Sequence, residues 1–416
     1  MTSTIERHVR GRALEALDDT RVVVVQGARQ VGKTTLVRDL VRAREGRLVT
    51  LDDELTRLAA RSDPTTFLRQ SPDRLLAIDE VQRAPELVLA LKAAVDEDPR
   101  PGRFLLTGSA DLLRLPAAED SLAGRAESIE LLGFSQGELT GHRERFVDRL
   151  LSGELFLDHG GALERRDYLD RAVAGAYPEA LARTTARRRN QWLDNYLARI
   201  VERDARDVSA MQTLDRLPDV LRILAARNAE ELNVSGLANA VDIPATTLTR
   251  QLDLLETLYL VHRVPAWSTN LSKRVVARPK SMLLDSGLAA RLINVTTDGL
   301  APGAHGNVAG HLLEAFVSAE IRRHQGWADE SFRISHYRDR AGGEVDLILE
   351  TGDGRVAGLE IKATARVTGG DSRWLTRLRD HLGKRFVAGI VLHTGPTSAP
   401  LGDRLAAVPL DVLWRT

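Results

Sequence analysis

The segment Val22–Leu36 reads VVVVQGARQVGKTTL and decides the fold of the first part of the chain. Its four consecutive valines are typical of a buried strand in a parallel sheet. The next residues, Gly27–Thr34, fit the pattern GxxxxGK[ST], and a helical run over Thr35–Arg42 follows. Loop N–H groups that converge at a helix N-terminus bind phosphate. The sequence therefore predicts a nucleotide site here rather than an ordinary glycine-rich turn.

Lysine is rare in this chain, which makes the lysine of the loop informative. There are six lysines and 52 arginines, and a compact ammonium is not replaced by a planar guanidinium at a tight site. We expect Lys33 to contact the β- and γ-phosphate oxygens and Thr34 to bind Mg²⁺. The expected nucleotide-binding residues are Gly27, Gln30, Gly32, Lys33, Thr34, Thr35 and Asp79.

A second apolar run, Leu75–Glu80, reads LLAIDE and ends in two carboxylates. Taken alone, the run fits a pair of solvated carboxylates at a strand end equally well. Its place after the phosphate loop favours catalysis. We therefore expect Asp79 to hold Mg²⁺ through water and Glu80 to act as the general base that activates the attacking water.

A third run, Phe104–Ser109, reads FLLTGS and places hydroxyl groups after a strand. Ligands of open α/β sheets bind at the carboxyl ends of the strands, so Thr107 or Ser109 is expected to sense the γ-phosphate. Capping of the next helix is the alternative for Ser109. With a further run at Leu48–Leu51, these strands predict an α/β domain with a parallel sheet.

Several strings carry a family resemblance. GARQVGKTT, LLAIDEVQRAPEL, FLLTGSADLL and SLAGRAESIELLGFSQGEL together resemble a family of prokaryotic AAA+ ATPases whose C-terminal domain was long catalogued as of unknown function. The likeness extends to GAYPEA around Tyr177 and to KRVVARPKSMLLDSGLAARL, and so covers nearly the whole chain. It implies an AAA+ core with a helical lid, ATP and Mg²⁺ as cofactors, and a homo-oligomer, expected to be a hexameric ring with ATP sites between subunits.

Such rings supply an arginine to the γ-phosphate of the neighbouring subunit, because a guanidinium neutralises transition-state charge. Arg125, in the string SLAGR, resembles the family's motif best, and Arg203 is second. An ion-paired surface arginine is the alternative for both.

Residues Asn233–Val261 have the pattern of a helix-turn-helix. Ser235 is expected to cap the first helix, and Leu248, Leu252, Leu255 and Tyr259 share one face of the second. The strands Val261–Pro265 and Met282–Leu284 are expected to pair as a hairpin, which completes a winged helix. The segment between them carries four cations and no carboxylate, so backbone binding to DNA is expected. The expected DNA contacts are Thr246, Arg250, Lys273, Arg274, Arg278 and Lys280. Packing against protein is the alternative.

The C-terminal part resembles the PD-(D/E)xK nuclease fold in the order of its charged residues. A helix over Gly306–Gln325 supplies Glu314, a strand supplies Asp346, and the next strand carries Glu360 and Lys362 on one face. In that chemistry Asp346 and Glu360 bind a second Mg²⁺, Glu314 assists, and Lys362 orients or deprotonates water. An edge-strand salt bridge is the alternative for Glu360 and Lys362, and cleavage stays undecided.

The whole chain has 416 residues, and Lys plus Arg and Asp plus Glu both total 58, so its net charge excludes a global electrostatic attraction to nucleic acid or membranes. It has no cysteine, no apolar run long enough for a membrane span, and no apolar signal segment at its start, which predicts a cytoplasmic protein. The expected domains are 1–149 (AAA+ core), 150–213 (helical lid), 214–285 (winged helix-turn-helix) and 286–416 (nuclease-like α/β).

These features predict an Mg²⁺-dependent ATPase ring that binds and remodels DNA, by translocation or branch migration. An ATP-dependent signalling or defence switch with a C-terminal effector is the alternative. A ring ATPase that acts on a protein partner is a third hypothesis.

Overall fold

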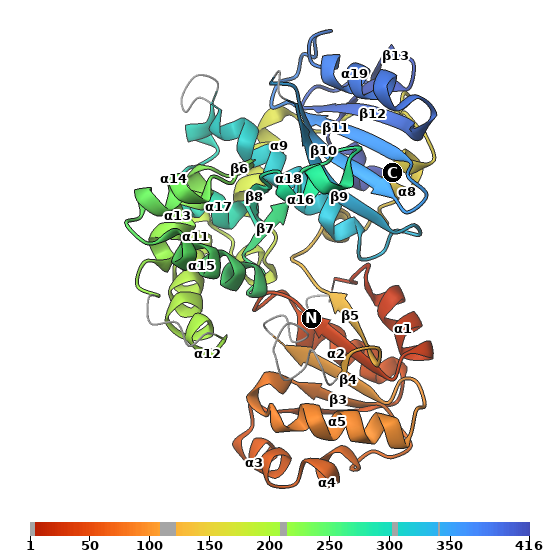
Figure 1. Ribbon diagram of the computed structural model, residues 1–416, viewed down its shortest axis with the longest axis vertical. Helices are drawn as coiled ribbons and strands as arrows, with labels where there is room; N and C mark the ends of the chain where they lie inside the picture. The colour runs from red at the N-terminus through yellow and green to blue at the C-terminus, as the bar shows by residue number, and fades with distance from the viewer. Residues whose placement is uncertain (1–4, 109–121, 209–213, 302–306, 340–341) are drawn as a thin grey trace. The chain divides into compact units, whose positions relative to one another are not determined.

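The computed structural model (Figure 1) describes residues 5–108, 122–208, 214–301, 307–339 and 342–416. The chain divides into two compact units. The first comprises Met1–Phe134 with Thr257–Tyr259, and the second comprises Ser135–Glu256 with Leu260–Thr416. Within the described ranges, no helix combines the length and the apolar character needed to cross a membrane.

A parallel five-stranded sheet forms the centre of the first unit, with the order β2-β3-β4-β1-β5. Its strands are β1 (Val22–Gln26), β2 (Arg47–Thr50), β3 (Leu76–Asp79), β4 (Phe104–Gly108) and β5 (Ala126–Glu130). Its helices are α1 (Arg10–Asp19), α2 (Lys33–Ala43), α3 (Glu54–Ser62), α4 (Pro64–Leu68) and α5 (Glu86–Glu97). The predicted α/β fold is confirmed. Because β1, β3 and β4 are adjacent and parallel, the segments that follow them meet at one edge of the sheet.

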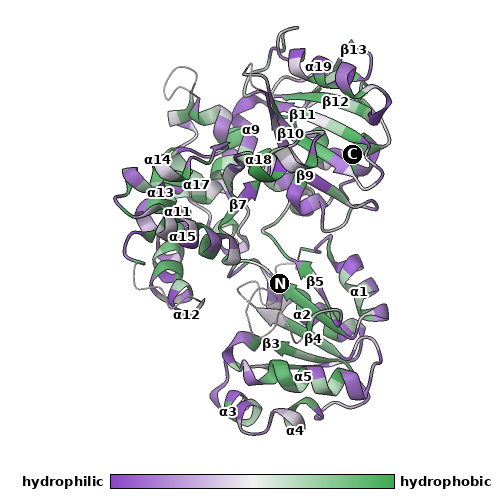
Figure 2. Cartoon of the chain, viewed as in Figure 1, coloured by the Kyte–Doolittle hydropathy of each residue, from purple (hydrophilic) through white to green (hydrophobic). Residues whose placement is uncertain are grey.

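The strands differ in burial according to their place in the sheet. Every residue of β1, β3 and β4 is buried, and Figure 2 shows hydrophobic residues along these strands. Strand β2 lies at the edge, where none of its residues is fully buried. The expectation of a buried strand at this position is therefore wrong.

The end of the first unit is held by an arginine from its N-terminal segment. The guanidinium of Arg7 donates hydrogen bonds to the carbonyl oxygens of Val31 (2.8 Å) and Leu132 (2.7 Å). The same group lies over the ring of Phe134, 4.9 Å from its centroid. Arg7 thus fixes the phosphate loop and the last residues of this unit to each other.

The string SQGEL begins the second unit, and its polar residues are used for folding. Ser135 and Glu138 form a reciprocal capping box at α7 (Gln136–Thr140). The buried carboxylate of Glu144 accepts from the hydroxyl of Ser135 (2.6 Å) and from Gly137 N (2.8 Å). Gln136 N donates to Glu320 at 3.0 Å. The compact division consequently falls between Phe134 and Ser135, inside the segment 1–149.

The middle of the second unit is helical. It contains α8 (Phe146–Leu151), α9 (Arg165–Ala174), α10 (Pro178–Leu181), α11 (Ala186–Arg199), a π-helical turn (Ile200–Asp204) and α12 (Ala205–Val208). It continues with α13 (Leu217–Ala226), α14 (Val234–Ala240), α15 (Ala245–Thr257), α16 (Leu271–Val276) and α17 (Ser286–Leu292). The cap of α14 is Asn233, whose side chain accepts from Gly236 N, and not Ser235. Ser235 lies inside the helix, since the cap and the first helical residue both come two residues earlier than expected.

The predicted hairpin forms in a three-stranded antiparallel sheet of order β6-β8-β7. Its strands are β6 (Glu230–Glu231), β7 (Val261–Val264) and β8 (Lys280–Leu283). Strand β8 is central, so its backbone is paired on both sides.

A six-stranded mixed sheet completes the second unit, with the order β13-β14-β12-β11-β10-β9. Its strands are β9 (Phe332–Arg338), β10 (Glu344–Thr351), β11 (Val356–Ile361), β12 (Phe386–His393), β13 (Ala399–Gly402) and β14 (Leu405–Pro409). The helices α18 (Val308–His324), α19 (Arg373–Leu382) and α20 (Val412–Arg415) accompany it. The expected helix is α18, and the two expected strands that carry Asp346 and Glu360 are β10 and β11.

The strings GAYPEA and LLDSGLAARL contain Gly175 and Gly287, and the close packing of α9 and α17 explains why glycine stands at these two positions. A Cβ on Gly287 would lie 2.7 Å from the Cα of Gly175, so only glycine fits there. The buried carboxylate of Asp285 accepts from Leu288 N and Ala176 N, both at 2.7 Å. These residues have structural roles.

Replacing Asp285 by alanine is expected to lower the free energy of unfolding of the second unit by about 3 kcal/mol, because two buried N–H groups lose their acceptor. Thermal unfolding followed by circular dichroism measures this change. The control is Asp298→Ala, whose side chain is 79% exposed and for which a change within about 0.5 kcal/mol is expected. Equal effects of the two substitutions would contradict the assignment.

Candidate functional site

The phosphate loop follows β1 and requires glycine at two positions. Gly27 has a φ of +151°, and a Cβ there would lie 2.0 Å from the carbonyl oxygen of Leu131. Gly32 has a φ of +102° and immediately precedes α2. The left-handed backbone lets the loop turn directly into the helix N-terminus. Gln30, with a φ of +62°, completes the turn.

The side chain of Lys33 lies inside the loop. It is buried, and its Nζ donates to the carbonyl oxygens of Gly27 and Ala28, each at 2.9 Å. The ammonium is thereby held at the N-terminus of α2, where the N–H groups of the first turn also favour an anion.

Asp79, at the end of β3, is joined to two threonines. Its Oδ2 accepts from the Thr34 hydroxyl at 3.0 Å, and its Oδ1 accepts from the Thr107 hydroxyl. A buried carboxylate beside a threonine hydroxyl forms an oxygen donor set of the kind that Mg²⁺ prefers. The residues present therefore fit a magnesium ion that accompanies a nucleotide.

Glu80 follows Asp79 in a left-handed backbone conformation, with a φ of +60°. Its backbone N–H donates to the Thr107 hydroxyl at 3.1 Å, and its carboxylate accepts from Gln82 Nε2 at 2.5 Å. Because of this backbone conformation, the side chains of Asp79 and Glu80 point in different directions. Asp79 is buried, whereas Glu80 is only half-buried. Sequence reasoning missed Gln82, which holds the carboxylate of Glu80.

Thr107 connects the two acids. Its hydroxyl, fully buried, donates to Asp79 and accepts from Glu80 N. The role of Thr107 as a γ-phosphate sensor stays a prediction, and its hydrogen bonds show that it also links Asp79 with Glu80. Its alternative, Ser109, lies outside the described residues.

Of the two candidate trans-acting arginines, the structure describes the side chain of Arg125 alone. Arg125 precedes β5 and forms a two-bond ion pair with Asp96, at 2.7 and 3.0 Å. Since β5 is parallel to β1, Arg125 lies at the sheet edge opposite the phosphate loop. Arg203 lies in the π-helical turn, and its side chain is outside the described part.

The expected DNA contacts are only partly exposed. Thr246 and Arg250 are exposed on α15, and Arg278 is exposed ahead of β8. The guanidinium of Arg274 is bound by both carboxylate oxygens of Glu350, so it is neutralised within the chain. The side chain of Lys273 is not among the described groups.

Lys280 is not a DNA contact, because it is 1% exposed. Its Nζ lies 2.5 Å from Glu314 Oε1, 2.6 Å from Glu344 Oε1 and 3.7 Å from Asp346 Oδ1. The segment around Lys280 contains cations and no carboxylate, so the local sequence gives no sign of these three partners, which come from α18 and β10.

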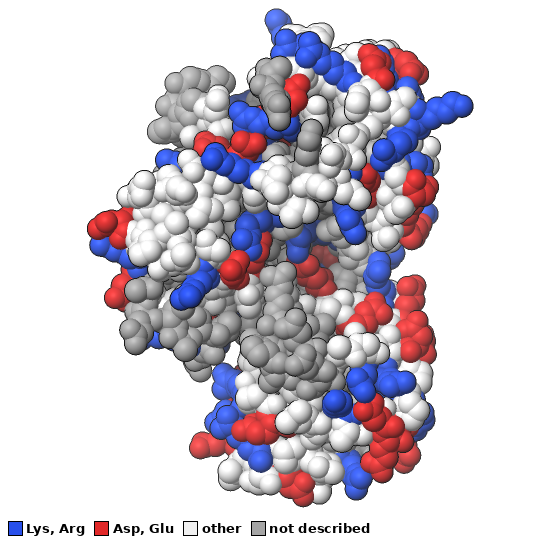
Figure 3. Space-filling model, in the orientation of Figure 1, with Lys and Arg blue, Asp and Glu red and all other residues white. Residues whose placement is uncertain are grey.

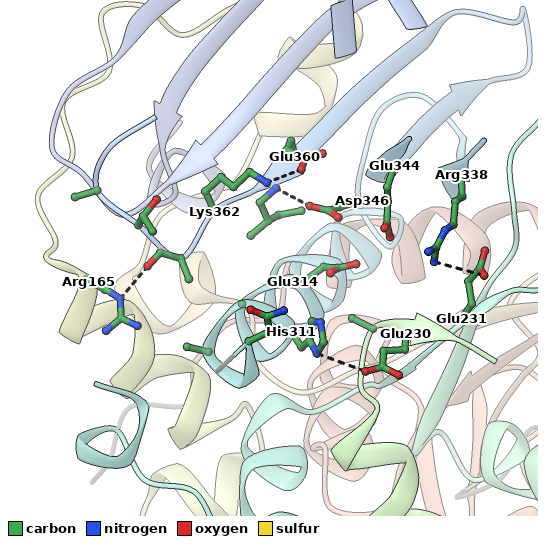
Figure 4. Close-up of a pocket in the computed structure, with 18 of the residues that line it drawn as sticks. Arg165, Glu230, Glu231, His311, Glu314, Arg338, Glu344, Asp346, Glu360 and Lys362 are labelled. Atoms are coloured by element: carbon green, nitrogen blue, oxygen red, sulfur yellow. Dashed lines mark hydrogen bonds and ion pairs between the residues drawn. The ribbon is translucent and has the colours of Figure 1, made fainter. Parts of the chain in front are cut away.

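The four predicted nuclease-like residues line one cleft of the second unit, with a volume of about 1120 Å³. Figure 4 shows Glu314, Asp346 and Glu360 directed into it from α18, β10 and β11, together with Lys362, which directly follows β11, and with Glu344 nearby. Lys362 Nζ binds Glu360 Oε1 at 2.8 Å, and Asp346 Oδ2 accepts from Ile361 N at 2.8 Å. The structure thus brings together the four residues that were predicted from their order in the sequence.

Burial dominates the electrostatics of this cleft. It raises the pKa of Glu360 to about 8, and the nearby Asp346 carboxylate acts in the same direction. It also raises the pKa of Glu314 and of Asp346. Burial opposes the charged form of Lys280, but Glu314, Asp346 and Glu344 outweigh it, so the pKa of this ammonium is raised. Lys280 therefore remains charged.

The cleft does not fit a second Mg²⁺ while Lys280 holds this position. Oxygen ligands bind such ions at about 2.0–2.6 Å, and an ion on Glu314 and Asp346 would face the ammonium that both acids already contact. Among the residues that the structure describes, no group of three or more His, Asp or Glu side chains is arranged to hold a metal. The expected second magnesium site at Asp346 and Glu360 is therefore corrected.

Comparison with known proteins divides the chain into three matches. Residues 19–140 match a family described as AAA domain, residues 165–299 match Domain of unknown function (DUF8612), and residues 309–413 match Domain of unknown function (DUF4143). Two similar relatives are Uncharacterized protein Mb2031c of Mycobacterium bovis and Uncharacterized protein Rv2008c of Mycobacterium tuberculosis. Each is 29% identical over 418 residues, covering 99% of this chain and 85% of the relative.

Similar solved structures include the Walker-type ATPase PABY2304 of Pyrococcus abyssi, with 16% identity and a TM-score of 0.42 over 70% of this chain and 96% of that chain. A second is PH0952 of Pyrococcus horikoshii, a Signal Transduction ATPase with Numerous Domains, with 13% identity and a TM-score of 0.20 over 78% of this chain and 49% of that chain. The AAA match and the parallel sheet with its phosphate loop agree. Most of the first unit thus matches the AAA domain and has its phosphate loop, and the last part of the chain matches a domain of unknown function.

Proposed function

We propose that this protein is an Mg²⁺-dependent ATP hydrolase whose second unit binds DNA and remodels it as ATP is hydrolysed. The observation that carries the proposal is the convergence of Lys33, Thr34, Asp79 and Glu80 at one edge of the parallel sheet. Phosphoryl transfer to water requires a cation, oxygen ligands for a metal and a carboxylate that water can reach. These four side chains provide such groups.

Each side chain has a defined part in this reaction. Thr34 and Asp79 would hold Mg²⁺, which supplies neutralisation of phosphate charge when it is bound. Lys33 stabilises the charge that develops on the phosphate oxygens, and Glu80 accepts a proton from the attacking water. The water oxygen bonds to the γ-phosphorus while the bond to the bridging oxygen breaks, which gives ADP and inorganic phosphate. Thr107 positions the two acids.

The proposal extends to a ring, expected to be hexameric, that binds and remodels DNA. Its support is the AAA match and the exposed cations Arg250 and Arg278 of the second unit. Figure 3 shows acidic and basic side chains interspersed over the visible face, and the net charge is zero. DNA binding is consequently expected to be moderate, directed to the backbone and sensitive to salt.

A nucleotide-dependent switch, or a ring that acts on a protein partner, is the second candidate. The observation that favours it is the internal pairing of Arg274 with Glu350 and of Lys280 with Glu314. These pairs remove two of the cations expected to contact phosphate.

Steady-state ATPase activity distinguishes the candidates. It is measured at low salt with Mg²⁺, alone and with single-stranded, duplex or four-way-junction DNA, and the DNA is then examined on a gel. Stimulation of several-fold by one DNA form with intact strands supports a remodelling motor. Slow turnover that no DNA form changes supports the switch or the protein-directed ring.

Replacing both Arg250 and Arg278 by alanine is expected to weaken DNA binding and to reduce the slope of log K against log salt by about 2, because two phosphate contacts are lost. Fluorescence anisotropy with a labelled duplex at several salt concentrations measures both quantities. The matched control replaces Arg69 and Arg100, exposed arginines of the first unit that form ion pairs with Glu97 and Asp98. An unchanged slope in the Arg250/Arg278 variant would assign these side chains to protein contacts.

A further inference from the structure

Lys280 is a buried ammonium inside an acidic cluster that comes from other elements. Its side chain is 2% exposed, and it contacts Glu314 of α18 and both Glu344 and Asp346 of β10. Burying an ammonium is costly unless it is paired and hydrogen-bonded. Three carboxylates within 3.7 Å satisfy this requirement.

The position of Lys280 is set by its backbone. Lys280 belongs to the central strand β8, where it is paired with Glu231 of β6 on one side and with Val264 of β7 on the other. The segment that follows β7 is in turn joined to β9, since Trp267 N donates to the carbonyl oxygen of His336 at 2.6 Å and His336 N donates to that of Pro265 at 3.0 Å. Withdrawal of the ammonium by a movement of β8 would require both of its neighbours to separate from it. This arrangement is that of a fixed residue and not of a mobile arm.

The second ammonium of the cleft completes the pairing of its acids. Lys362 Nζ binds Glu360 Oε1 at 2.8 Å and lies 3.8 Å from Asp371 Oδ1. Lys280 and Lys362 together therefore contact Glu314, Glu344, Asp346 and Glu360. A divalent ion would add two positive charges beside ammonium groups that already neutralise part of this cluster.

We propose that Lys280 is the resident cation of this acidic cleft and occupies the place that a divalent metal ion would need, so that the native protein binds no divalent ion there. The proposal does not depend on the proposed ATPase or DNA function, since it concerns only groups of the second unit. It identifies the cleft as a metal-free site whose acids are held in place by a lysine.

Mn²⁺ binding to the full-length, nucleotide-free chain tests the proposal. The Asp79→Asn substitution is present throughout, so that the phosphate loop contributes no metal site. Free Mn²⁺ is measured by electron paramagnetic resonance during a titration. Only weak, non-specific Mn²⁺ binding is expected in this background. Lys280→Met is expected to gain one site whose affinity exceeds that weak binding by at least about tenfold, since three carboxylates lose their ammonium.

Two matched variants show whether the effect belongs to Lys280. Lys280→Arg retains a cation, and Lys362→Met removes the other ammonium but leaves Lys280, so neither is expected to gain the site. Adding Asp346→Asn to Lys280→Met is expected to abolish the gained site.

Each outcome decides the question. A Mn²⁺ site in the Asp79→Asn background that disappears with Asp346→Asn would overturn the proposal, and so would a folded Lys280→Met variant that gains no site. If Lys280→Met does not fold, the double variant Lys280→Met/Glu344→Gln, which removes one acid together with the ammonium, is titrated in its place and the same two results apply.

Discussion

Replacing Lys33 by alanine is expected to lower kcat/KM for ATP by at least about 10³-fold, which corresponds to about 4 kcal/mol of transition-state stabilisation. The Lys33 ammonium is buried inside the phosphate loop, on the carbonyl oxygens of Gly27 and Ala28. No other lysine lies nearer in the sequence than Lys92. Alanine removes the ammonium that we expect to stabilise the developing phosphate charge.

Release of inorganic phosphate at saturating Mg²⁺ measures this loss, and thermal unfolding verifies that the first unit is still folded. The control is Lys92→Ala, the same substitution at an exposed position of α5 in the same unit. Its turnover is expected to equal that of the wild-type protein. Normal turnover in the Lys33 variant would refute the assignment of the phosphate loop.

Replacing Glu80 by glutamine is expected to lower kcat by about 10²–10⁴-fold while the affinity for ATP is retained. The amide preserves the size of the side chain but does not accept a proton from water. Because the backbone of Glu80 is fixed through its N–H bond to Thr107, the substitution leaves Asp79 and its partners in place. The variant should therefore accumulate bound ATP.

Single-turnover hydrolysis and binding of a fluorescent ATP analogue separate the two effects. Glu86→Gln, at an exposed position near the start of α5, is the matched control and should hydrolyse ATP normally. Hydrolysis at the wild-type rate would remove Glu80 as the base. Loss of ATP binding would show instead that Glu80 supports the structure of the site.

The parts of the fold that could be predicted are those with local signals. Strands β1, β3 and β4 are buried throughout, so their sequences are continuous apolar runs. Strand β5 was missed, because at the sheet edge only Ile129 of its residues is buried and its sequence AESIE has no such run. Burial at the edge of a sheet depends on neighbours that the local sequence does not specify.

The candidate sites also differ in whether a local sequence signal specifies them. Lys33 and Thr34 are neighbours in one motif, so their spacing alone brings them together. Lys280 and Glu314 are separated by 34 residues, and no periodicity connects a strand of one sheet with a helix beside another. The sequence did contain one signal, the rarity of lysine, but counting charges along Ser268–Ser281 assigned Lys280 to the surface.

The lysine at position 280 also has an evolutionary consequence. Here Glu314, Asp346 and Glu360 are all present, and one side chain on β8 stands among them. Lysine codons are one nucleotide away from codons for glutamine and methionine. A lineage that carries this cleft is therefore a single mutation from exposing its acids to a metal ion.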